Sequence, residues 1–405
     1  MPASPSTARA INDRLALRLL QQEGPLTAGQ LKQLTGLSRP TVADLVERLA
    51  ASGLITVVGE SGEQRRGPNA RLYGIVADRA HLAALDVRTE SVSVLVSDLL
   101  GRVLAEASVP IGGDTGAGPA EGQAVEQAVT LVERAVKEAG VDRLHTVGIG
   151  APGLIDPGTG ELRSSVGLPG WHRSLIAALQ ERFPEARVSV ENETNLAALA
   201  EQREGAARDR HTFVLLWLGH SPGAAVVLDG TLRRGASGGT GEIGFLPVPG
   251  SAVLPSATDC SGGFHSLAGA AAVAELAGGN GRSGPGKEVA DAVLAVREAA
   301  EAVGLDGAGD APEAARLLDT LAGRIALGVA SVVAILDPGC VVLGGEIGQA
   351  GGEPLAARVA EHIGRMSPLP TEVRAGGLGG TAVLRGALLT ARERAQDDLF
   401  PPPGR

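Results

Sequence analysis

Residues 188–196 read Val188-Ser189-Val190-Glu191-Asn192-Glu193-Thr194-Asn195-Leu196. Val188 and Val190 alternate with polar residues, as in a short strand. The Ala- and Leu-rich run from Leu196 to Glu201 predicts a helix. The polar cluster therefore lies at a strand-to-helix junction, where ligands gather in α/β proteins. Carboxylates and carboxamides suit the hydroxyls of a sugar, but Asn and Thr also cap helices. Taken alone, the cluster leaves both functions open.

The composition predicts a globular protein of two or three domains. The chain has 405 residues, of which 44% are hydrophobic, 20% are charged and 2% are aromatic. Two cysteines do not make a disulfide framework and fit a reducing compartment. We recognise no signal peptide and no apolar run of transmembrane length, so we expect a cytoplasmic protein with no membrane partner.

The charge is unevenly distributed along the chain. The net charge of −10 argues against a protein that coats nucleic acid in general. Residues 1–78, however, hold nine Lys and Arg against seven Asp and Glu. The acidity therefore belongs to the larger C-terminal part, and the N-terminal part is mildly basic.

Residues 1–76 have the element order of a winged helix-turn-helix. Apolar residues at helical spacing predict a helix over 11–22. Thr27 caps a short second helix, Gly36 suits the tight turn after it, and Ser38 caps a third helix that continues to Ala51. This third helix corresponds to the one that enters the major groove in helix-turn-helix proteins.

A predicted hairpin, residues 54–58 and 70–73, follows the third helix and forms the wing. Basic residues in its tip suit phosphates or a narrow minor groove. A helix-turn-helix that contacts protein instead of DNA is the alternative. We predict these DNA contacts: Thr27, Ser38, Arg39, Pro40, Thr41, Asp44, Arg48, Arg65, Arg66, Gly67, Asn69 and Arg71.

The rest of the chain alternates strands and helices. Strands are predicted over 81–87, 91–98 and 102–106, and again over 213–218 and 224–228. Helices are predicted over the following ranges: 121–139, 266–276, 288–303 and 311–336. This pattern predicts an α/β body.

Five motifs together make the chain resemble the ROK family of repressors and sugar kinases. They are Ala151-Pro152-Gly153-Leu154-Ile155-Asp156, Leu168-Pro169-Gly170-Trp171, Val190 to Asn195, Arg234 to Gly244, and Leu336 to Gly339 with Leu343-Gly344-Gly345. The resemblance implies a two-lobed α/β fold, actin-like and ribonuclease-H-like, of the sugar-kinase type behind the winged helix-turn-helix. We expect the head over 1–76 and the first lobe over 79–200, completed by a helix over 381–395. The second lobe, which we expect to dimerise, covers 201–380.

Two phosphate loops of the kinase members are altered in this chain. The first, an Asp-x-Gly-Gly-Thr turn in the kinases, reads Asp86-Val87-Arg88-Thr89-Glu90. The second reads Gly219-His220-Ser221-Pro222-Gly223. Without the glycines the backbone cannot approach phosphates closely. The catalytic Asp of the kinases corresponds to Glu193, one methylene longer. We therefore predict no enzyme activity and no cofactor.

The zinc motif of the family is also incomplete. Phe245 takes the place of its His, and of the Cys cluster only Cys260 remains, with His265 where the last Cys would be. Two ligands do not make a closed tetrahedral site, so we expect no metal.

The polar residues that match the family's sugar site predict an effector pocket. Phe245 and Leu267 make it more apolar than in the kinases, so either the effector differs from the usual hexoses or the pocket is vestigial. Asn192 and Glu242 have a purely structural alternative as capping and loop-bonding residues. The predicted effector residues are Gly153, Asn192, Glu193, Glu242, Phe245 and His265.

Together these features predict a repressor of carbohydrate-related genes. It would bind a double-stranded operator with an inverted repeat as a homodimer or dimer of dimers, and respond to a sugar or sugar derivative. A sugar kinase with a fused head, or a regulator controlled by a protein partner, are the alternatives.

Overall fold

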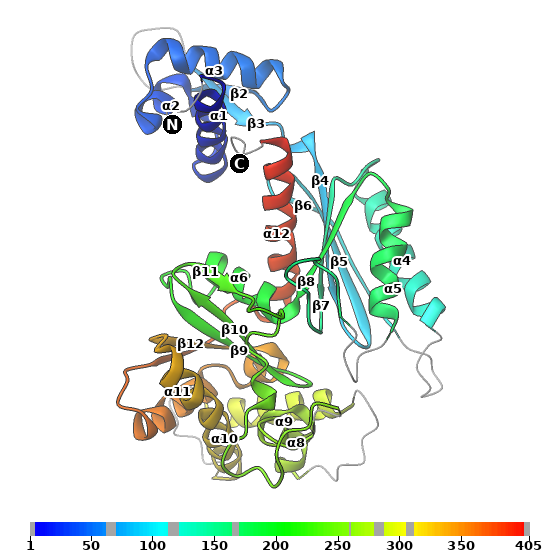
Figure 1. Cartoon of the computed structure of the whole chain (residues 1–405), viewed down its shortest axis with the longest axis vertical. Helices are drawn as coiled ribbons and strands as arrows, with labels where there is room; N and C mark the ends of the chain where they lie inside the picture. The colour runs from blue at the N-terminus through cyan, green and yellow to red at the C-terminus, as the bar shows by residue number, and fades with distance from the viewer. Residues whose placement is uncertain are drawn as a thin grey trace.

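The computed structural model describes residues 5–61, 70–111, 121–163, 170–258, 261–278, 287–304 and 312–400. A small head lies at one end of the molecule, and two α/β lobes follow along the long axis (Figure 1). The C-terminal helix α12 (Ala382–Leu399) runs from the head alongside the first lobe towards the second.

The head holds three helices and a small antiparallel sheet of order β1-β3-β2. Its elements are α1 (Pro5–Gln22), β1 (Leu26–Thr27), α2 (Ala28–Thr35), α3 (Arg39–Ala51), β2 (Ile55–Ser61) and β3 (Ala70–Ile75). Thr27 and Gln30 form a capping box on α2, Gly36 ends that helix at φ 70°, and the Ser38 side chain accepts from Thr41 N. These local signals were predicted. The predicted start of the first helix at residue 11 is wrong, because the helix begins at Pro5.

The first lobe is a five-stranded sheet of order β6-β5-β4-β7-β8. Its elements are η1 (Ala77–Arg79), β4 (His81–Val87), β5 (Ser91–Asp98), β6 (Val103–Pro110), α4 (Glu121–Glu138), β7 (Thr146–Ala151), α5 (Trp171–Arg182) and β8 (Arg187–Asn192). β4, β7 and β8 are parallel, so their carboxyl ends lie at one edge. Helices α4 and α5 cover one face and α12 covers the other.

The second lobe is built on a sheet of order β11-β10-β9-β12-β13. Its strands are β9 (Phe213–Leu218), β10 (Pro222–Leu228), β11 (Thr231–Arg233), β12 (Cys340–Gly344) and β13 (Glu372–Ala375). Its helices are α6 (Glu193–Glu204), η2 (Ile243–Phe245), α7 (His265–Ala268), α8 (Ala270–Leu276), α9 (Lys287–Val303), α10 (Pro312–Leu336), α11 (Gly345–Met366) and η3 (Gly379–Thr381). The single helix predicted over 266–276 is wrong, since Gly269 separates α7 from α8 at extended φ and ψ.

Helix α12 packs very closely on two elements, α6 between the lobes and strand β7 of the first sheet. A Cβ at Gly386 would lie 2.0 Å from the Leu196 carbonyl, and a Cβ at Gly148 would lie 2.6 Å from the Ala387 carbonyl. Only glycine fits at these two approaches, since real Cβ atoms do not come so close to a carbonyl. One hydrophobic cluster consequently runs without a break from Leu17 and Leu45 of the head, through α12, to Leu215 of the second lobe.

Among the described residues, α10 is the one helix that is long and apolar enough to cross a membrane. Length and composition alone do not distinguish such a helix from the core helix of a globular domain. Leu321, Ile325 and Val329 of α10 are buried in the core of the second lobe, and a Cβ at Gly328 would lie 2.5 Å from the Phe264 ring. The apolar character of α10 thus serves a packed core.

Candidate functional site

The exposed start of α3 presents the surface predicted for the major groove. Arg39 and Pro40 are exposed in the first turn, directly after the cap Ser38. The Ser38 and Thr41 hydroxyls lie 2.8 Å apart, so each has a partner within the turn. No ion pair of Arg39 is present among the residues that the structure describes, which leaves its guanidinium directed to solvent.

Three of the predicted DNA contacts, Thr27, Asp44 and Arg48, have partners within the head. Thr27 is 9% exposed, and its hydroxyl belongs to the capping box of α2. Arg48 pairs with Asp44 on its own helix and with Asp13 of α1, where Nη2 lies 2.6 Å from Oδ1. The hydrogen bond that Arg48 donates to Asp13 raises the pKa of Arg48 above its ordinary value. The pair of Arg48 and Asp13 joins α3 to α1. The two residues are 35 positions apart in the sequence, so no local pattern predicts their contact.

The wing is described only up to the ends of its strands. Arg71 is exposed on β3, opposite Glu60 in the register of the hairpin. Arg65, Arg66, Gly67 and Asn69 lie outside the described residues.

Asn192 is the N-cap of α6 and has every polar group paired. Its Oδ1 accepts from Thr194 N at 3.0 Å and from Asn195 N at 3.2 Å. Its Nδ2 donates to the Gly153 carbonyl at 3.1 Å and to Glu193 Oε2 at 2.9 Å. A carboxamide offers two donors and two lone pairs, so Asn192 can contact an effector only by exchanging one of these partners.

Glu193 is the first residue of α6, and the pKa of its carboxyl group is strongly shifted. Burial raises its pKa to about 8, while Arg88 acts in the opposite direction and Glu242 adds to the rise. Glu193 is therefore protonated at neutral pH and can donate a hydrogen bond. Desolvation also raises the pKa of Glu242, whose side chain is nonetheless exposed.

Phe245 and His265 lie together on the second-lobe side of the site. Their rings meet edge to face with centroids 5.0 Å apart, and His265 Nε2 is buried without a partner. Burial lowers the pKa of His265, so it is neutral at physiological pH. Leu267 is buried in the core of the second lobe. Cys260 lies outside the described residues. Within the part of the chain that the structure describes, no three His, Cys, Asp or Glu side chains are grouped so that they could hold a metal ion.

Arg88 forms an ion cluster between the lobes that the sequence did not predict. Its Nε lies 2.6 Å from Asp86 Oδ1 and its Nη2 lies 3.1 Å from Asp86 Oδ2. Its Nη1 lies 3.2 Å from Glu346 Oε1, on the first turn of α11 in the second lobe. The guanidinium carbon also lies 4.9 Å from the centroid of the Trp217 ring. The turn after β4, which holds phosphate in the kinases, is thus joined to the second lobe by its own arginine.

A second interlobe ion pair starts from the strand that precedes α6. Glu191 is 8% exposed, and its Oε2 lies 2.7 Å from Arg234 Nε in the loop after β11. The other carboxylate oxygen, Oε1, accepts from Asn195 Nδ2 at 3.0 Å. Glu191 therefore fixes the polar cluster against the second lobe, and each of its two oxygens already has a partner.

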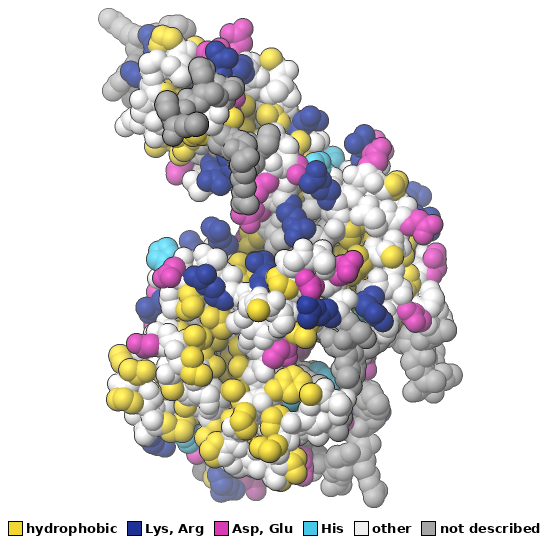
Figure 2. Space-filling model, in the orientation of Figure 1, with side chains coloured by type: hydrophobic (Ala, Val, Ile, Leu, Met, Phe, Trp, Pro, Cys, Tyr) yellow, Lys and Arg dark blue, Asp and Glu magenta, His cyan; other side chains and the backbone are white. Residues whose placement is uncertain are grey.

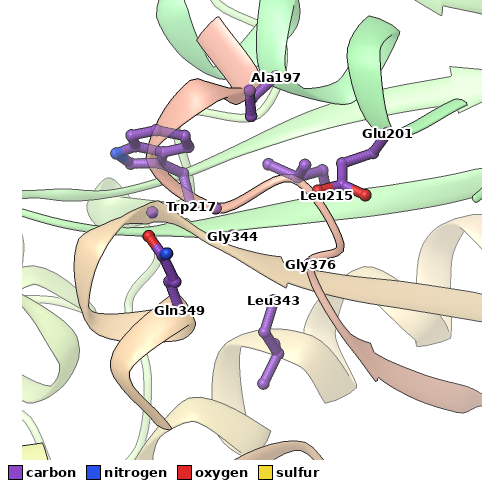
Figure 3. Close-up of a pocket in the computed structure, with 11 residues that line it drawn as sticks. Ala197, Glu201, Leu215, Trp217, Leu343, Gly344, Gln349 and Gly376 are labelled. Carbon is purple, nitrogen blue, oxygen red and sulfur yellow. The ribbon is translucent and has the colours of Figure 1, made fainter. Parts of the chain in front are cut away.

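A small pocket lies where α6, α12 and the second sheet meet. Trp217, Gln349 and Glu201 line it (Figure 3), together with Gly344 and Gly376. Its interior of about 10 Å³ is room for about one water molecule. The pocket is therefore too small for a sugar or a nucleotide. We call this junction of α6, α12 and the second sheet the hinge.

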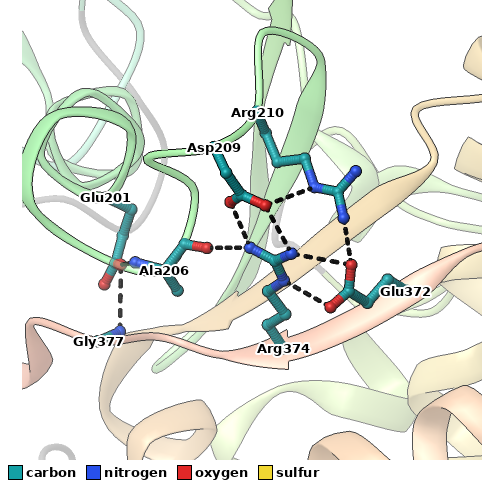
Figure 4. A network of polar contacts seen from close by, with 7 residues as sticks. All are labelled: Glu201, Ala206, Asp209, Arg210, Glu372, Arg374 and Gly377. Atoms are coloured by element: carbon teal, nitrogen blue, oxygen red, sulfur yellow. Dashed lines mark hydrogen bonds and ion pairs between the residues drawn. The ribbon is translucent and has the colours of Figure 1, made fainter.

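Buried Glu201 fixes this hinge through backbone groups. Its carboxylate accepts from Ala206 N at 2.6 Å, Gly377 N at 3.1 Å and Leu378 N at 3.0 Å. Close by, Arg374 of β13 pairs with Asp209 and Glu372 and donates to the Ala206 carbonyl (Figure 4). Both groups tie the end of α6 to the segment that leads into α12.

The fold and these sites define a winged helix-turn-helix protein with a two-lobed sugar-kinase-like body. The model of the ROK family matches residues 83–394, and the model of the MarR family matches residues 11–67. The chain belongs to the ROK family.

Two curated relatives are transcriptional regulators. The chain is 25% identical over 244 residues to a xylose repressor of Caldicellulosiruptor bescii, covering 59% of each protein. It is 27% identical over 244 residues to the DNA-binding transcriptional dual regulator NagC of Escherichia coli K12, covering 59% of this chain and 58% of NagC. The chain thus matches less than two thirds of the length of these relatives.

Solved structures extend the likeness to both branches of the family. A ROK family transcriptional regulator, a homolog of the E. coli MLC protein, matches 97% of this chain and 98% of its own with a TM-score of 0.73 at 19% identity, which shows the fold of head and body. A ROK hexokinase from Thermus thermophilus matches 78% of this chain and 99% of its own with a TM-score of 0.58 at 31% identity.

Proposed function

We propose that this chain is a cytoplasmic DNA-binding transcriptional regulator that represses carbohydrate-related genes. Its affinity for the operator falls or rises when a sugar binds between the lobes. The observation that carries this proposal is the fusion of an exposed recognition-helix start, Arg39 and Pro40, to a sugar-kinase body. The regulator relatives have the same family body, which supports it further.

The body itself does not act as a kinase in this proposal. Phosphoryl transfer depends almost entirely on positioning and on electrostatic stabilisation of the phosphates. In this chain Arg88, Asp86 and Glu346 occupy the region that the phosphate loops would surround, and Glu193 is protonated where a general base needs a carboxylate.

The regulator acts as a homodimer or as a dimer of dimers on an inverted repeat. Helix-turn-helix dimers bind half-sites about one helical turn apart. The second lobe carries exposed large hydrophobic side chains, among them Leu254, Leu294 and Ile335, and hydrophobic side chains gather on the face of this lobe seen in Figure 2. Such a surface suits contact with a second copy.

Two assays on the full-length protein test the proposal. A gel shift on the DNA upstream of its own gene should give a sequence-specific complex at moderate salt, which Arg39→Ala should weaken. A coupled ADP-release assay over a panel of sugars should give no turnover. The absence of a specific complex would refute the regulator, and turnover would establish the kinase alternative. Operator binding that no sugar or sugar phosphate changes would favour control by a protein partner.

A further inference from the structure

The two turns that hold phosphates in the kinases are already bridged by side chains of this chain. Glu346 Oε1 accepts from Arg88 of the first turn at 3.2 Å. Its other oxygen, Oε2, lies against the second turn, since a Cβ at Gly219 would be 2.5 Å from it. The Glu346 carboxylate therefore lies between the turns, as an anion supplied by the protein itself.

All three nitrogens of the Arg88 guanidinium already have carboxylate partners. Nε and Nη2 face the two oxygens of Asp86, which is 7% exposed, and Nη1 faces Glu346. Trp217 lies beside the guanidinium at 4.9 Å. An incoming phosphate would have to displace Glu346 and leave its carboxylate without the arginine, while Oε2 is already buried without a partner.

The charged groups around Arg88 are carboxylates, which disfavour the binding of a further anion. The carboxylates of Asp86 and Glu346 both act on Arg88, and the carboxyl group of Glu193, which is protonated at neutral pH, lies nearby. The imidazole of His172 lies against the Arg88 backbone, but burial lowers the pKa of His172 to about 4, so this group is neutral at pH 7. One guanidinium thus faces several carboxyl groups, and a further anion meets repulsion.

We propose that the interlobe site takes an uncharged sugar and rejects its phosphate ester, and that Glu346 is the residue that determines this specificity. The carboxylate of Glu346 fills the position that a phosphate would need and pairs with Arg88 in its stead. An uncharged sugar can use the remaining polar groups near α6, including the protonated Glu193 as a hydrogen-bond donor. This inference rests on the proposed sugar-sensing function and deepens it.

Isothermal titration of the full-length protein with matched pairs tests the inference. The pairs are glucose with glucose 6-phosphate and N-acetylglucosamine with N-acetylglucosamine 6-phosphate, and inorganic phosphate alone is a third arm. For the pair that binds, the wild type should bind the free sugar at least about tenfold more tightly than its ester. Glu346→Gln should raise the affinity for the ester about tenfold or more and leave the free sugar within about threefold.

Glu353→Gln serves as the matched control, because Glu353 is an exposed carboxylate of α11 that lies beyond the kink of this element at Gly352. It should change neither affinity. Far-UV circular dichroism and operator binding of Glu346→Gln establish that this variant is folded.

Ester binding by the wild type that equals or exceeds sugar binding overturns the inference and leaves the sugar-responsive regulator standing. A gain for inorganic phosphate alone in Glu346→Gln, without a gain for the ester, also overturns it. If neither the wild type nor Glu346→Gln binds any of the sugars, esters or inorganic phosphate, the proposed sugar sensing is refuted, and the inference with it.

Discussion

Arg14 of α1 and Asp397 of α12 form an ion pair that joins the head to the C-terminal helix. Arg14 Nη1 also donates to the Phe400 carbonyl at 3.4 Å, just beyond the end of that helix. At its other end α12 crosses α6 between the lobes, where Gly386 meets the Leu196 carbonyl. One rigid element therefore contacts both the DNA-binding head and the hinge of the proposed effector site.

Arg14→Ala should weaken the coupling between effector and operator. Exposed ion pairs stabilise proteins by about 0–1 kcal/mol, so the melting temperature should change little. The factor by which effector changes operator affinity should fall severalfold, because the head loses its charged contact with α12. Gel shifts with and without effector measure this factor. Arg9→Ala, an exposed arginine on the same helix, is the control and should keep the wild-type factor. An unchanged factor in Arg14→Ala would rule out this route.

Arg39→Ala and Arg48→Ala should have different consequences. Arg39 is exposed at the start of α3, and loss of a base contact costs about 1–3 kcal/mol of specific binding. Arg48 pairs with Asp13 and Asp44, so its loss should lower the free energy of unfolding by about 1 kcal/mol and leave the operator affinity of the folded protein close to wild type. Operator titrations and urea denaturation separate the two effects. Equal losses of operator affinity in both variants would contradict the assignment of Arg48 to the packing of α1 on α3.

Glu193 should make the stability of the protein depend on pH. The unfolded carboxyl titrates near 4.5, and in the folded state its pKa is about 8, mainly because of burial. Between these values the folded protein keeps a proton that the unfolded chain releases, so stability falls as the pH rises through this window. Glu193→Gln should remove this part of the pH dependence, which thermal melts from pH 4 to pH 9 can measure.

The comparison needs a carboxylate that lies away from the site. Glu181→Gln, on the exposed face of α5, should keep the wild-type pH profile. A profile of Glu193→Gln that follows the wild type at every pH would show that Glu193 is ionised in the folded protein.

Glu201→Ala should strongly destabilise the hinge. The buried carboxylate accepts from three backbone N–H groups at 2.6–3.1 Å, and these partly buried donors would lose their acceptor. Loss of the acceptor of a hydrogen bond costs about 1–3 kcal/mol. Chemical denaturation measures this loss, and Arg203→Ala, exposed on the same helix, should be close to neutral. A small effect of Glu201→Ala would mean that water replaces the carboxylate.

The features that the sequence predicted correctly depend on neighbours along the chain. The caps Thr27 and Ser38, the turn at Gly36 and the strand-to-helix junction at Asn192 follow local rules of backbone geometry and capping. They could be predicted because every partner lies within a few residues.

The cluster around Arg88 could not be predicted in this way. Arg88 and Glu346 are separated by 258 positions, and only the assembled lobes bring them together. The sequence showed that the glycines of the first phosphate turn are missing, but not that the arginine replacing one of them pairs across the lobes. The break between α7 and α8 also has a distant partner, because Ala270 N donates to the His220 carbonyl at 3.2 Å.

The continuous hydrophobic cluster along α12 limits how this regulator can be rebuilt. A head exchanged at the chain boundary near residue 76 would leave behind the C-terminal segment. Ala395 of α12 and Phe400, just after this helix, are buried in the same cluster as Leu17 and Leu45. A chimera that is to carry a new DNA specificity therefore has to bring two pieces of sequence from the opposite ends of its donor, the head and the matching C-terminal segment. The unit of exchange is defined by packing, and it is discontinuous in the gene.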